Sequence, residues 1–279
     1  MSHSDNATPE LTTVARQIRK RLVQMSHDSR APHLASALSC VDMLVAMYWG
    51  ALQIDPARPR DPDRDRFLLS KGHAAAALYA VLAQRGFLPV EELKTFNQPG
   101  SRLPEQPSPG DVPGIEAATG SLGHGLPIGL GMALAGRIQG RSYRVVTLMS
   151  DGECNEGSVW EAALFAAAKR LSHVTAIVDY NGWQATGRSN DIMQLAPLAD
   201  KWQAFGWSAV EVDGHDIKGI IEVLRAPPLA RDKPTAIIAR TIKGKGVSFM
   251  EDDNNWHYRI PNDEELTAAL RELDAASDA

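Results

Sequence analysis

The sequence contains few cysteines and no concentration of basic residues. Only Cys40 and Cys154 occur among its 279 residues. Two cysteines so far apart provide neither a disulfide framework nor a CxxC pair of metal ligands, and we interpret both as reduced thiols of a cytoplasmic protein. The net charge is −5 and no run of basic residues is present, so nucleic acid is not expected as a partner.

Long apolar segments are missing as well. No apolar stretch approaches the roughly 20 residues that a membrane-spanning helix needs. The opening residues, MSHSDNATPE, lack the basic and apolar regions of a signal peptide. We therefore expect a soluble, cytoplasmic protein with no membrane partner. The hydrophobic share of 44% is sufficient for a sizeable core, in one large domain or two small ones.

Helical and strand patterns alternate along the chain. Apolar residues at helical spacing predict helices over residues 11–24, 39–49 and 74–84. Short apolar runs predict strands over residues 66–69, 144–149, 175–179, 207–212 and 235–241. This alternation is typical of an α/β fold with a doubly wound, mostly parallel sheet and helices on both faces. Because no linker or repeat interrupts it, we predict a single domain over residues 1–279, with residues 261–279 as a surface tail, either helical or frayed.

An acidic residue and a glycine follow the predicted strand over residues 144–149. In open α/β sheets, ligands bind outside the carboxyl ends of the strands, and the N-terminus of the next helix suits a phosphate. Asp151 would repel that phosphate unless a divalent cation such as Mg²⁺ lies between them. Asn181 follows the next strand and can supply a second oxygen ligand, and the carbonyl of Trp183 is available in the turn after it. Taken singly, Asp151 can be a helix cap and Asn181 a turn residue; their spacing favours a metal site.

The segment from Ser150 to Asn181 resembles the thiamine diphosphate motif, which reads Gly-Asp-Gly, a spacer, and then Asn-Asn. Ser150 replaces the first glycine and Tyr180 the first asparagine, which leaves the presumed ligands in place. Four further segments resemble transketolases and occur in the order of that family: SKGHAAAALYAVLA, PGIEAATGSLGHGLPIGLGMALA, VEVDGHD and TIKGKGVSFMEDDNNWH. The resemblance covers about residues 12–260. It implies the thiamine diphosphate-binding fold of the N-terminal half of a transketolase, with thiamine diphosphate and Mg²⁺ or Ca²⁺ as cofactors.

The resemblance also implies roles for individual residues. The metal ligands are Asp151, Asn181 and the carbonyl of Trp183, and the backbone of Gly152 donates to the diphosphate. Further residues that line the cofactor are Ser36, His73, Gly120, Ser121, Leu122, Lys243 and His257. The candidate catalytic residues are His33, His73 and His257, because histidines can move protons and bind sugar hydroxyls at neutral pH. Glu156 matches a glutamate at the interface between subunits.

At single positions a structural interpretation stays open. The alternatives are a helix cap for His73, a surface side chain for His33, a solvated side chain for Lys243, an aromatic contact for His257 and a first-turn acid for Glu156. His124 is a possible neighbour of the cofactor in the Gly-rich loop, and we interpret His215 as structural.

Two departures from the family pattern bear on function. The Pro-rich loop over residues 97–114 carries Gln106-Pro107 where many transketolases have Gly-His-Pro. A histidine that contacts substrate is thus missing, and a modified or unphosphorylated acceptor sugar becomes a reasonable hypothesis. The family's pyrimidine-binding domain, which carries the glutamate that protonates the cofactor, is absent as well. We therefore predict that the chain moves a two-carbon ketol unit from a ketose to an aldose only together with a separate C-terminal-half subunit, in an α2β2 assembly.

Other functions remain as alternatives. The chain can be a subunit of another thiamine diphosphate carboligase or of an enzyme that decarboxylates 2-oxoacids, although SKGHAAA and TGSLGHG argue against it. It can also be a non-catalytic homologue, but such a protein has no need of His33, His73 and His257. A nicotinamide-binding domain is disfavoured, since no GxGxxG motif follows a first strand.

Overall fold

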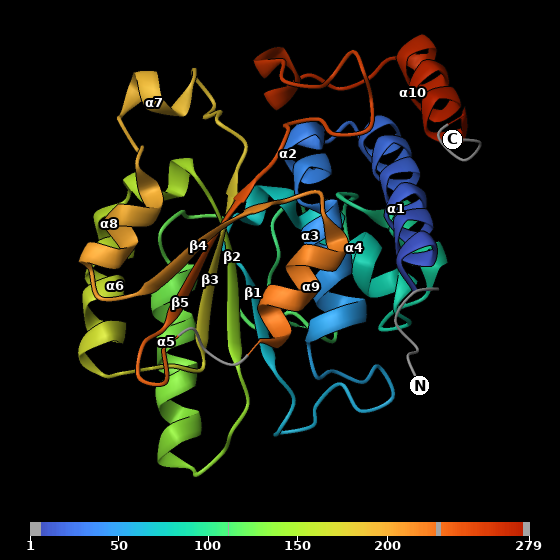
Figure 1. Ribbon diagram of the computed structural model, residues 1–279. Helices are drawn as coiled ribbons and strands as arrows, with labels where there is room; N and C mark the ends of the chain where they lie inside the picture. Colours follow the sequence, from blue (N-terminus) through green and yellow to red (C-terminus); the bar gives the residue numbers. More distant parts are fainter. Residues whose placement is uncertain (1–6, 111, 227–229, 276–279) are drawn as a thin grey trace.

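The computed structural model describes residues 7–110, 112–226 and 230–275 (Figure 1). Its centre is a five-stranded sheet in the order β1-β2-β3-β5-β4, and every neighbouring pair of strands is parallel. The strands are β1 (Arg66–Leu69), β2 (Val145–Ser150), β3 (Val174–Tyr180), β4 (Ser208–Asp213) and β5 (Thr235–Arg240). Each of the five predicted strands is confirmed to within one residue at either end.

Alternate residues of each strand face opposite layers of helices. Val146 and Leu148 of β2 belong to one hydrophobic core, whereas Val145 and Met149 belong to the other. The first core contains residues of α1 (Ala7–Ser29), α2 (Leu34–Ser39), α3 (Val41–Val45), α4 (Ala75–Gln84) and α9 (Ile217–Arg225). The second contains residues of α5 (Gly125–Ile138), α6 (Gly157–Ala168) and α8 (Leu198–Ala204). Figure 1 shows the two layers on either side of the sheet, which confirms the predicted α/β fold. The two layers explain why β1, β2, β3 and β5 are mostly apolar and buried, whereas the edge strand β4 is only partly buried.

The chain around residue 40 differs from the prediction of one helix over residues 39–49. It forms α2, a break at Cys40, α3 and then a π-helical turn over Ala46–Ala51. The carbonyl of Ser36 accepts a hydrogen bond from the Ser39 hydroxyl at 3.0 Å and another from Lys71 Nζ at 2.8 Å. These side chains compete with the backbone for the carbonyl, and the helix is interrupted where they do so.

The predicted tail contains a helix. α10 (Asp263–Ala275) lies along α1 (Figure 1), with Ala269 and Leu273 buried. His27 Nε2 contacts Asp263 at 2.8 Å, and Lys20 Nζ contacts Asp274 at 2.6 Å. The last four residues of the predicted tail lie outside the described part of the chain. Within that part, no helix combines the length and the apolar character that crossing a membrane requires.

The carboxyl ends of the parallel strands meet at one edge of the sheet. The short helix α7 (Ser189–Ile192) follows β3 at this edge, and α2 lies at the same end of the molecule (Figure 1). Ligands of open α/β sheets bind at such an edge. The candidates for a ligand-binding site are therefore the residues that follow β1, β2, β3 and β5.

Candidate functional site

Asp151 joins the ends of β2 and β3. Its backbone N–H donates to the carbonyl of Asp179 at 3.2 Å, which continues the pairing of the two strands. Its carboxylate accepts hydrogen bonds from the N–H groups of Gly152 and Gly182, both at 2.9 Å, and from the Ser189 hydroxyl at 2.8 Å. A carboxylate is therefore fixed at the carboxyl edge of the sheet, where the sequence predicts a metal ligand.

Asn181 lies in the turn after β3, next to this carboxylate. Its side chain is buried, and its Oδ1 accepts from the N–H of Trp183 at 3.0 Å. Among the described residues, no group of three His, Cys, Asp or Glu side chains could hold a metal. The predicted set is of another kind, since it combines one carboxylate, one amide oxygen and one backbone carbonyl, all of which are hard ligands suited to Mg²⁺.

Two buried charged side chains at this edge form no direct ion pair, although each lies within the electrostatic range of the other. Asp151 is fully buried, and burial raises its pKa to about 6. Lys243 is 1% exposed, and its Nζ contacts only neutral groups, Asn254 Oδ1 at 2.6 Å and His257 Nδ1 at 2.9 Å. Burial, with Lys71 nearby, lowers the pKa of Lys243 to about 8. Neither forms an ion pair with another described residue. A divalent cation beside Asp151 and a diphosphate beside Lys243 would balance both charges, so the residues present fit a metal-bound diphosphate.

The three candidate catalytic histidines form one cluster. The ring centroids of His33 and His73 are 5.5 Å apart, those of His33 and His257 5.3 Å, and those of His73 and His257 6.2 Å. They come from the start of α2, the turn after β1 and the segment before α10. The backbone N–H of His33 donates to the carbonyl of His257 at 3.0 Å, and His33 has left-handed backbone angles with φ 69°. The prediction that these residues share a site agrees with this geometry.

The protonation of these histidines follows from their surroundings. Burial, together with the charge of Lys243, lowers the pKa of His257 to about 3. Burial, together with the charge of Lys71, lowers the pKa of His73 well below its usual value. Both rings are thus neutral at physiological pH. Because the Lys243 ammonium can only donate, His257 Nδ1 must accept, and the ring proton resides on Nε2.

A buried ion pair lies beneath the cluster. Lys71 and Asp179 are both fully buried and paired, and Lys71 Nζ also donates to the carbonyl of Ser36 at 2.8 Å. Asp179 accepts further hydrogen bonds from the hydroxyls of Ser39, at 2.6 Å, and Thr241. Ser36 was predicted from the sequence, but Lys71 and Asp179 were not. A signal was present, since an acid inside a buried strand needs a partner.

The predicted Gly120-Ser121-Leu122 loop runs beside the turn that carries His73. A Cβ on Gly72 would lie 2.6 Å from the backbone nitrogen of Gly120, so only glycine allows this approach. Gly120 itself has φ 137°, and a Cβ there would lie 1.4 Å from Gln106 Oε1. The side chain that replaces the family histidine thus reaches the cofactor loop.

Glu153, which was not predicted from the sequence, supports this loop from below. It is fully buried and accepts from the N–H groups of Gly123, at 2.8 Å, and Ser150, at 3.3 Å, and from the Ser70 hydroxyl. It belongs to a 3-10 turn over Gly152–Asn155 that precedes α6. The helix that the sequence predicts to begin near Glu156 begins at Gly157, directly after this turn, so the N–H groups that reach the Asp151 carboxylate come from Gly152 and Gly182 and not from the helix. Glu156 lies exposed at the start of α6.

His124 and His215 have structural contacts. His124 Nδ1 lies 3.0 Å from the carbonyl of Leu122 and helps to hold the loop, with its ring exposed. His215 Nδ1 contacts Asp42 at 2.8 Å, while its Nε2 accepts from the N–H of Ile242 at 2.9 Å. His215 thereby supports the segment that carries Lys243, in agreement with its structural interpretation.

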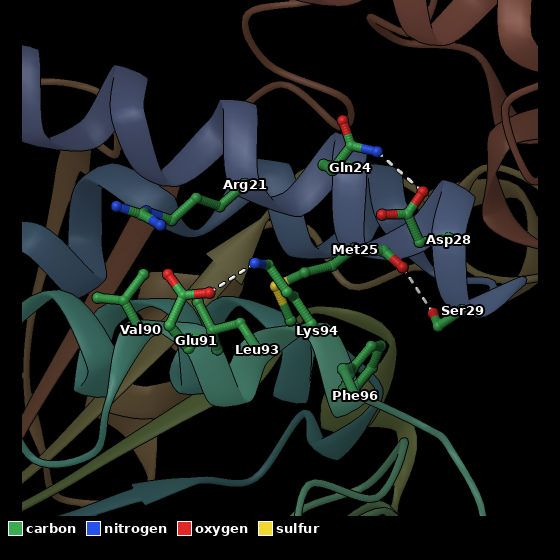
Figure 2. Close-up of a pocket in the computed structure, with 10 residues that line it drawn as sticks. All are labelled: Arg21, Gln24, Met25, Asp28, Ser29, Val90, Glu91, Leu93, Lys94 and Phe96. Atoms are coloured by element: carbon green, nitrogen blue, oxygen red, sulfur yellow. Dashed lines mark hydrogen bonds and ion pairs between the residues drawn. The ribbon is translucent and has the colours of Figure 1, made fainter.

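Another pocket lies between α1 and the 3-10 turn over Val90–Thr95 (Figure 2). Its apolar lining is formed by Met25, Val90, Leu93 and Phe96. The charged residues at its edge are engaged with neighbours, such as Lys94 with Glu91 at 2.5 Å (Figure 2). This pocket shares no residue with the site described above.

Comparison with known proteins identifies the family of the chain. A family model described as "Transketolase, thiamine diphosphate binding domain" matches residues 11–275. The chain belongs to the transketolase family. Its match extends past residue 260, where the resemblance found in the sequence ends, and includes α10.

Relatives of this transketolase chain include proteins of its own length. It is 40% identical over 91% of its length to an apulose-4-phosphate transketolase subunit of Phocaeicola vulgatus, of which it covers 90%. It is 41% identical over 95% of its length to the 6-deoxy-6-sulfo-D-fructose transketolase subunit SqwG of a Clostridium species, of which it covers 96%. Human transketolase is 38% identical over 88% of this chain, which covers 39% of that protein.

The fold of this transketolase chain matches that of solved transketolases. A transketolase variant from Pichia stipitis superposes with a TM-score of 0.87 and 27% identity over 95% of this chain and 41% of that one. The resemblance to transketolases, the thiamine diphosphate-binding α/β fold and the transketolase-type transferase class are thereby confirmed. The roles of the individual site residues stay predictions.

Proposed function

We propose that this chain is the diphosphate- and Mg²⁺-binding subunit of a two-chain transketolase in the cytoplasm. It would move a two-carbon ketol unit from a ketose donor to an aldose acceptor, and residues 1–279 would act as one domain. The observation that carries the proposal is the placement of an unpaired buried carboxylate, Asp151, and an unpaired buried ammonium, Lys243, beside three clustered histidines. A metal–diphosphate pair supplies the two opposite charges that these residues lack.

The chain's own residues have distinct tasks in this proposal. Asp151, Asn181 and the carbonyl of Trp183 would hold Mg²⁺ or Ca²⁺, and Lys243 with the N–H of Gly152 would bind the diphosphate. The residues that would line the rest of the cofactor are Ser36, His73, Gly120, Ser121, Leu122 and His257. Thiamine diphosphate, when bound, supplies the carbanion chemistry that breaks a carbon–carbon bond next to a carbonyl.

The histidines can form hydrogen bonds with sugar hydroxyls in complementary ways. The Nε2–H of His257 is a donor, because its Nδ1 accepts from Lys243. His33 Nδ1 lies 3.1 Å from the carboxylate of Glu105 and donates to it, which leaves Nε2 as an acceptor in the neutral ring. One ring can therefore donate a hydrogen bond to a substrate oxygen while its neighbour accepts a hydrogen bond or a proton. His73, deeper in the cluster, completes the set of catalytic candidates.

A second subunit completes the site in this proposal. It would supply the pyrimidine-binding domain and the glutamate that protonates the cofactor, and two copies of each chain would form an α2β2 enzyme with Glu156 near the interface. The exposed position of Glu156 supports this placement. The word "subunit" in the names of two relatives that this chain covers almost completely supports a separate partner.

The substrate would be a sugar that differs from the substrates of ordinary transketolases. The named relatives act on an apulose phosphate and on a sulfonated deoxyfructose, and Gln106 stands where many transketolases have a histidine. A sugar with a modified or unphosphorylated carbon chain is consistent with both observations. Kinetics on xylulose 5-phosphate that match those of ordinary transketolases would contradict this part of the proposal.

Calorimetric titration of thiamine diphosphate with Mg²⁺ tests the proposal. It is performed on this chain alone and on its mixture with a separately expressed C-terminal-half transketolase subunit. We expect tight, metal-dependent binding in the mixture, followed by ketol transfer from a ketose. Turnover of 2-oxoacids without ketol transfer would support the carboligase alternative. The absence of binding in a well-formed complex would support a non-catalytic homologue.

A further inference from the structure

Two side chains lie at the outer edge of the histidine cluster and have no role in the proposed function. Glu105 comes from the Pro-rich loop, and its carboxylate contacts His33 at 3.1 Å while its side chain remains 35% exposed. Tyr258 follows His257 and is 61% exposed. The Tyr258 ring centroid lies 5.4 Å from that of His33 and 4.5 Å from that of His257. Both residues therefore touch the candidate catalytic rings on one side and solvent on the other.

Each of these two side chains has unused binding capacity. In the described part of the chain, the second carboxylate oxygen of Glu105 and the hydroxyl of Tyr258 have no hydrogen-bond partner. A carboxylate accepts hydrogen bonds and donates none, so its natural partner on a sugar is a hydroxyl group. An exposed aromatic face packs against apolar C–H surface and carries a polar tip. Together the two groups match both the hydroxyls and the C–H face of a sugar carbon chain.

We propose that Glu105 and Tyr258 form a specificity edge, which recognises the neutral, hydroxyl-bearing part of the sugar next to the transferred unit and rejects an anionic group there. This inference rests on the proposed function, since it concerns the same site. The fixed negative charge of Glu105 repels a carboxylate, phosphate or sulfonate placed beside His33. An anionic substituent of the substrate must then lie at a position remote from this edge.

The arrangement of charges supports this selectivity. The cations of the site, Lys71 and Lys243, are buried behind the histidines, whereas the Glu105 side chain is 35% exposed beside His33. A substrate group entering from solvent thus meets the carboxylate before the ammonium groups. His33, His73 and Glu105 also line one small cavity whose other walls come mostly from buried residues of α1, α2 and α4, so Glu105 packs directly against the cluster.

A comparison of two donors tests the proposal in the assembled two-chain enzyme. L-Erythrulose and β-hydroxypyruvate deliver the same two-carbon unit, but the group next to that unit is a neutral hydroxyl-bearing carbon in the first and a carboxylate in the second. In the E105Q variant we expect the ratio of kcat/KM for hydroxypyruvate to kcat/KM for erythrulose to rise about tenfold or more. E91Q, which makes the same change at an exposed glutamate on another segment, should leave the ratio unchanged. A ratio in E105Q equal to that of the wild type would overturn the proposal.

Substitutions at Tyr258 form a second part of this test. Y258F retains the ring, and we expect it to resemble the wild type within a few-fold in KM for erythrulose. Y258A removes the ring, and we expect a rise in KM of about tenfold with kcat much less affected, because the contact binds substrate rather than reacting with it. Equal losses in kcat for Y258F and Y258A would contradict a packing role for the ring.

A measurement without turnover separates this inference from the proposed function. If the wild-type complex transfers no ketol unit from any donor, the proposed function fails. The ring of His33 can still be titrated by NMR in histidine-labelled protein, with the H33N variant used for assignment. Burial lowers the pKa of His33 and Glu105 partly opposes this effect, so E105Q should lower it further. Other side chains also face His33, and none of them is substituted in this comparison; they are Lys71, His73, Lys243, His257 and Tyr258. An unaltered titration would show that Glu105 does not act on His33 and would refute the specificity edge.

Discussion

The buried pair of Lys71 and Asp179 leads to a quantitative prediction. Both side chains are fully buried, and the ammonium also donates to the carbonyl of Ser36. Replacing Lys71 with methionine keeps a similar volume but leaves the carboxylate of Asp179 buried with only the hydroxyls of Ser39 and Thr241 as donors. Removing one partner of a buried ion pair costs about 3–5 kcal/mol. We therefore expect K71M to lower the free energy of unfolding by that amount.

Urea unfolding followed by circular dichroism measures this loss. With a slope of about 3 kcal/mol per molar urea, the midpoint should fall by about 1–1.7 M. K94M provides the matched control, because Lys94 and Glu91 form an ion pair in which both side chains are largely exposed, at 78% and 77%. Such pairs contribute about 0–1 kcal/mol. If K71M and K94M shift the midpoint equally, the buried pair does not have the energetic role that its burial implies.

Three further predictions concern the metal, the diphosphate and the C-terminal helix. D151A should abolish Mg²⁺-dependent binding of thiamine diphosphate to the assembled enzyme, and residual metal-dependent heat in calorimetry would contradict its role as a ligand. K243M should weaken that binding about ten- to a hundredfold, as expected for the loss of one charge-assisted hydrogen bond; an unchanged Kd would exclude contact with the diphosphate. The hydrogen bonds that the His27 ring donates to Asp28 and to Asp263 raise the pKa of His27, so its stabilising contact with α10 should be fully present below the usual histidine pKa and lost as the pH rises through the raised value. Hydrogen exchange of α10 should increase over that range in the wild type and show no such dependence in H27N.

Much of the fold follows from the sequence because burial on both faces leaves a clear pattern. The strands of a parallel sheet covered by two helical layers are largely apolar, and this holds for β1, β2, β3 and β5, whereas the edge strand β4 is only partly buried. All five strands were predicted to within one residue. The segment around Cys40 was not predicted, since the helix is interrupted by hydrogen bonds to the carbonyl of Ser36 from Ser39 and from Lys71, a residue distant in sequence. No local sequence pattern indicates a hydrogen-bond partner that is distant along the chain.

The candidate site, like the fold, was predicted from the sequence only in part. Asp151 and Asn181 were found because strand ends converge at a known edge of the sheet. The contact between Glu105 and His33 joins residues 72 positions apart and places a loop residue beside a helix terminus. Its geometry depends on the path of a loop with five prolines, which neither hydrophobic periodicity nor spacing describes. Glu153 was missed for a related reason, because its partners are two backbone N–H groups and the hydroxyl of Ser70, which lies 83 positions away in the sequence.

The left-handed backbone of His33 restricts how far laboratory selection can raise the thermal stability of this chain without loss of activity. A side chain in that conformation costs about 1–2 kcal/mol relative to a relaxed backbone, and glycine would relieve most of the cost. A library screened only for heat resistance would therefore favour glycine at position 33 and would discard a member of the histidine cluster. Screens on this protein should select for ketol transfer and thermal tolerance together, because at this residue the two demands oppose each other.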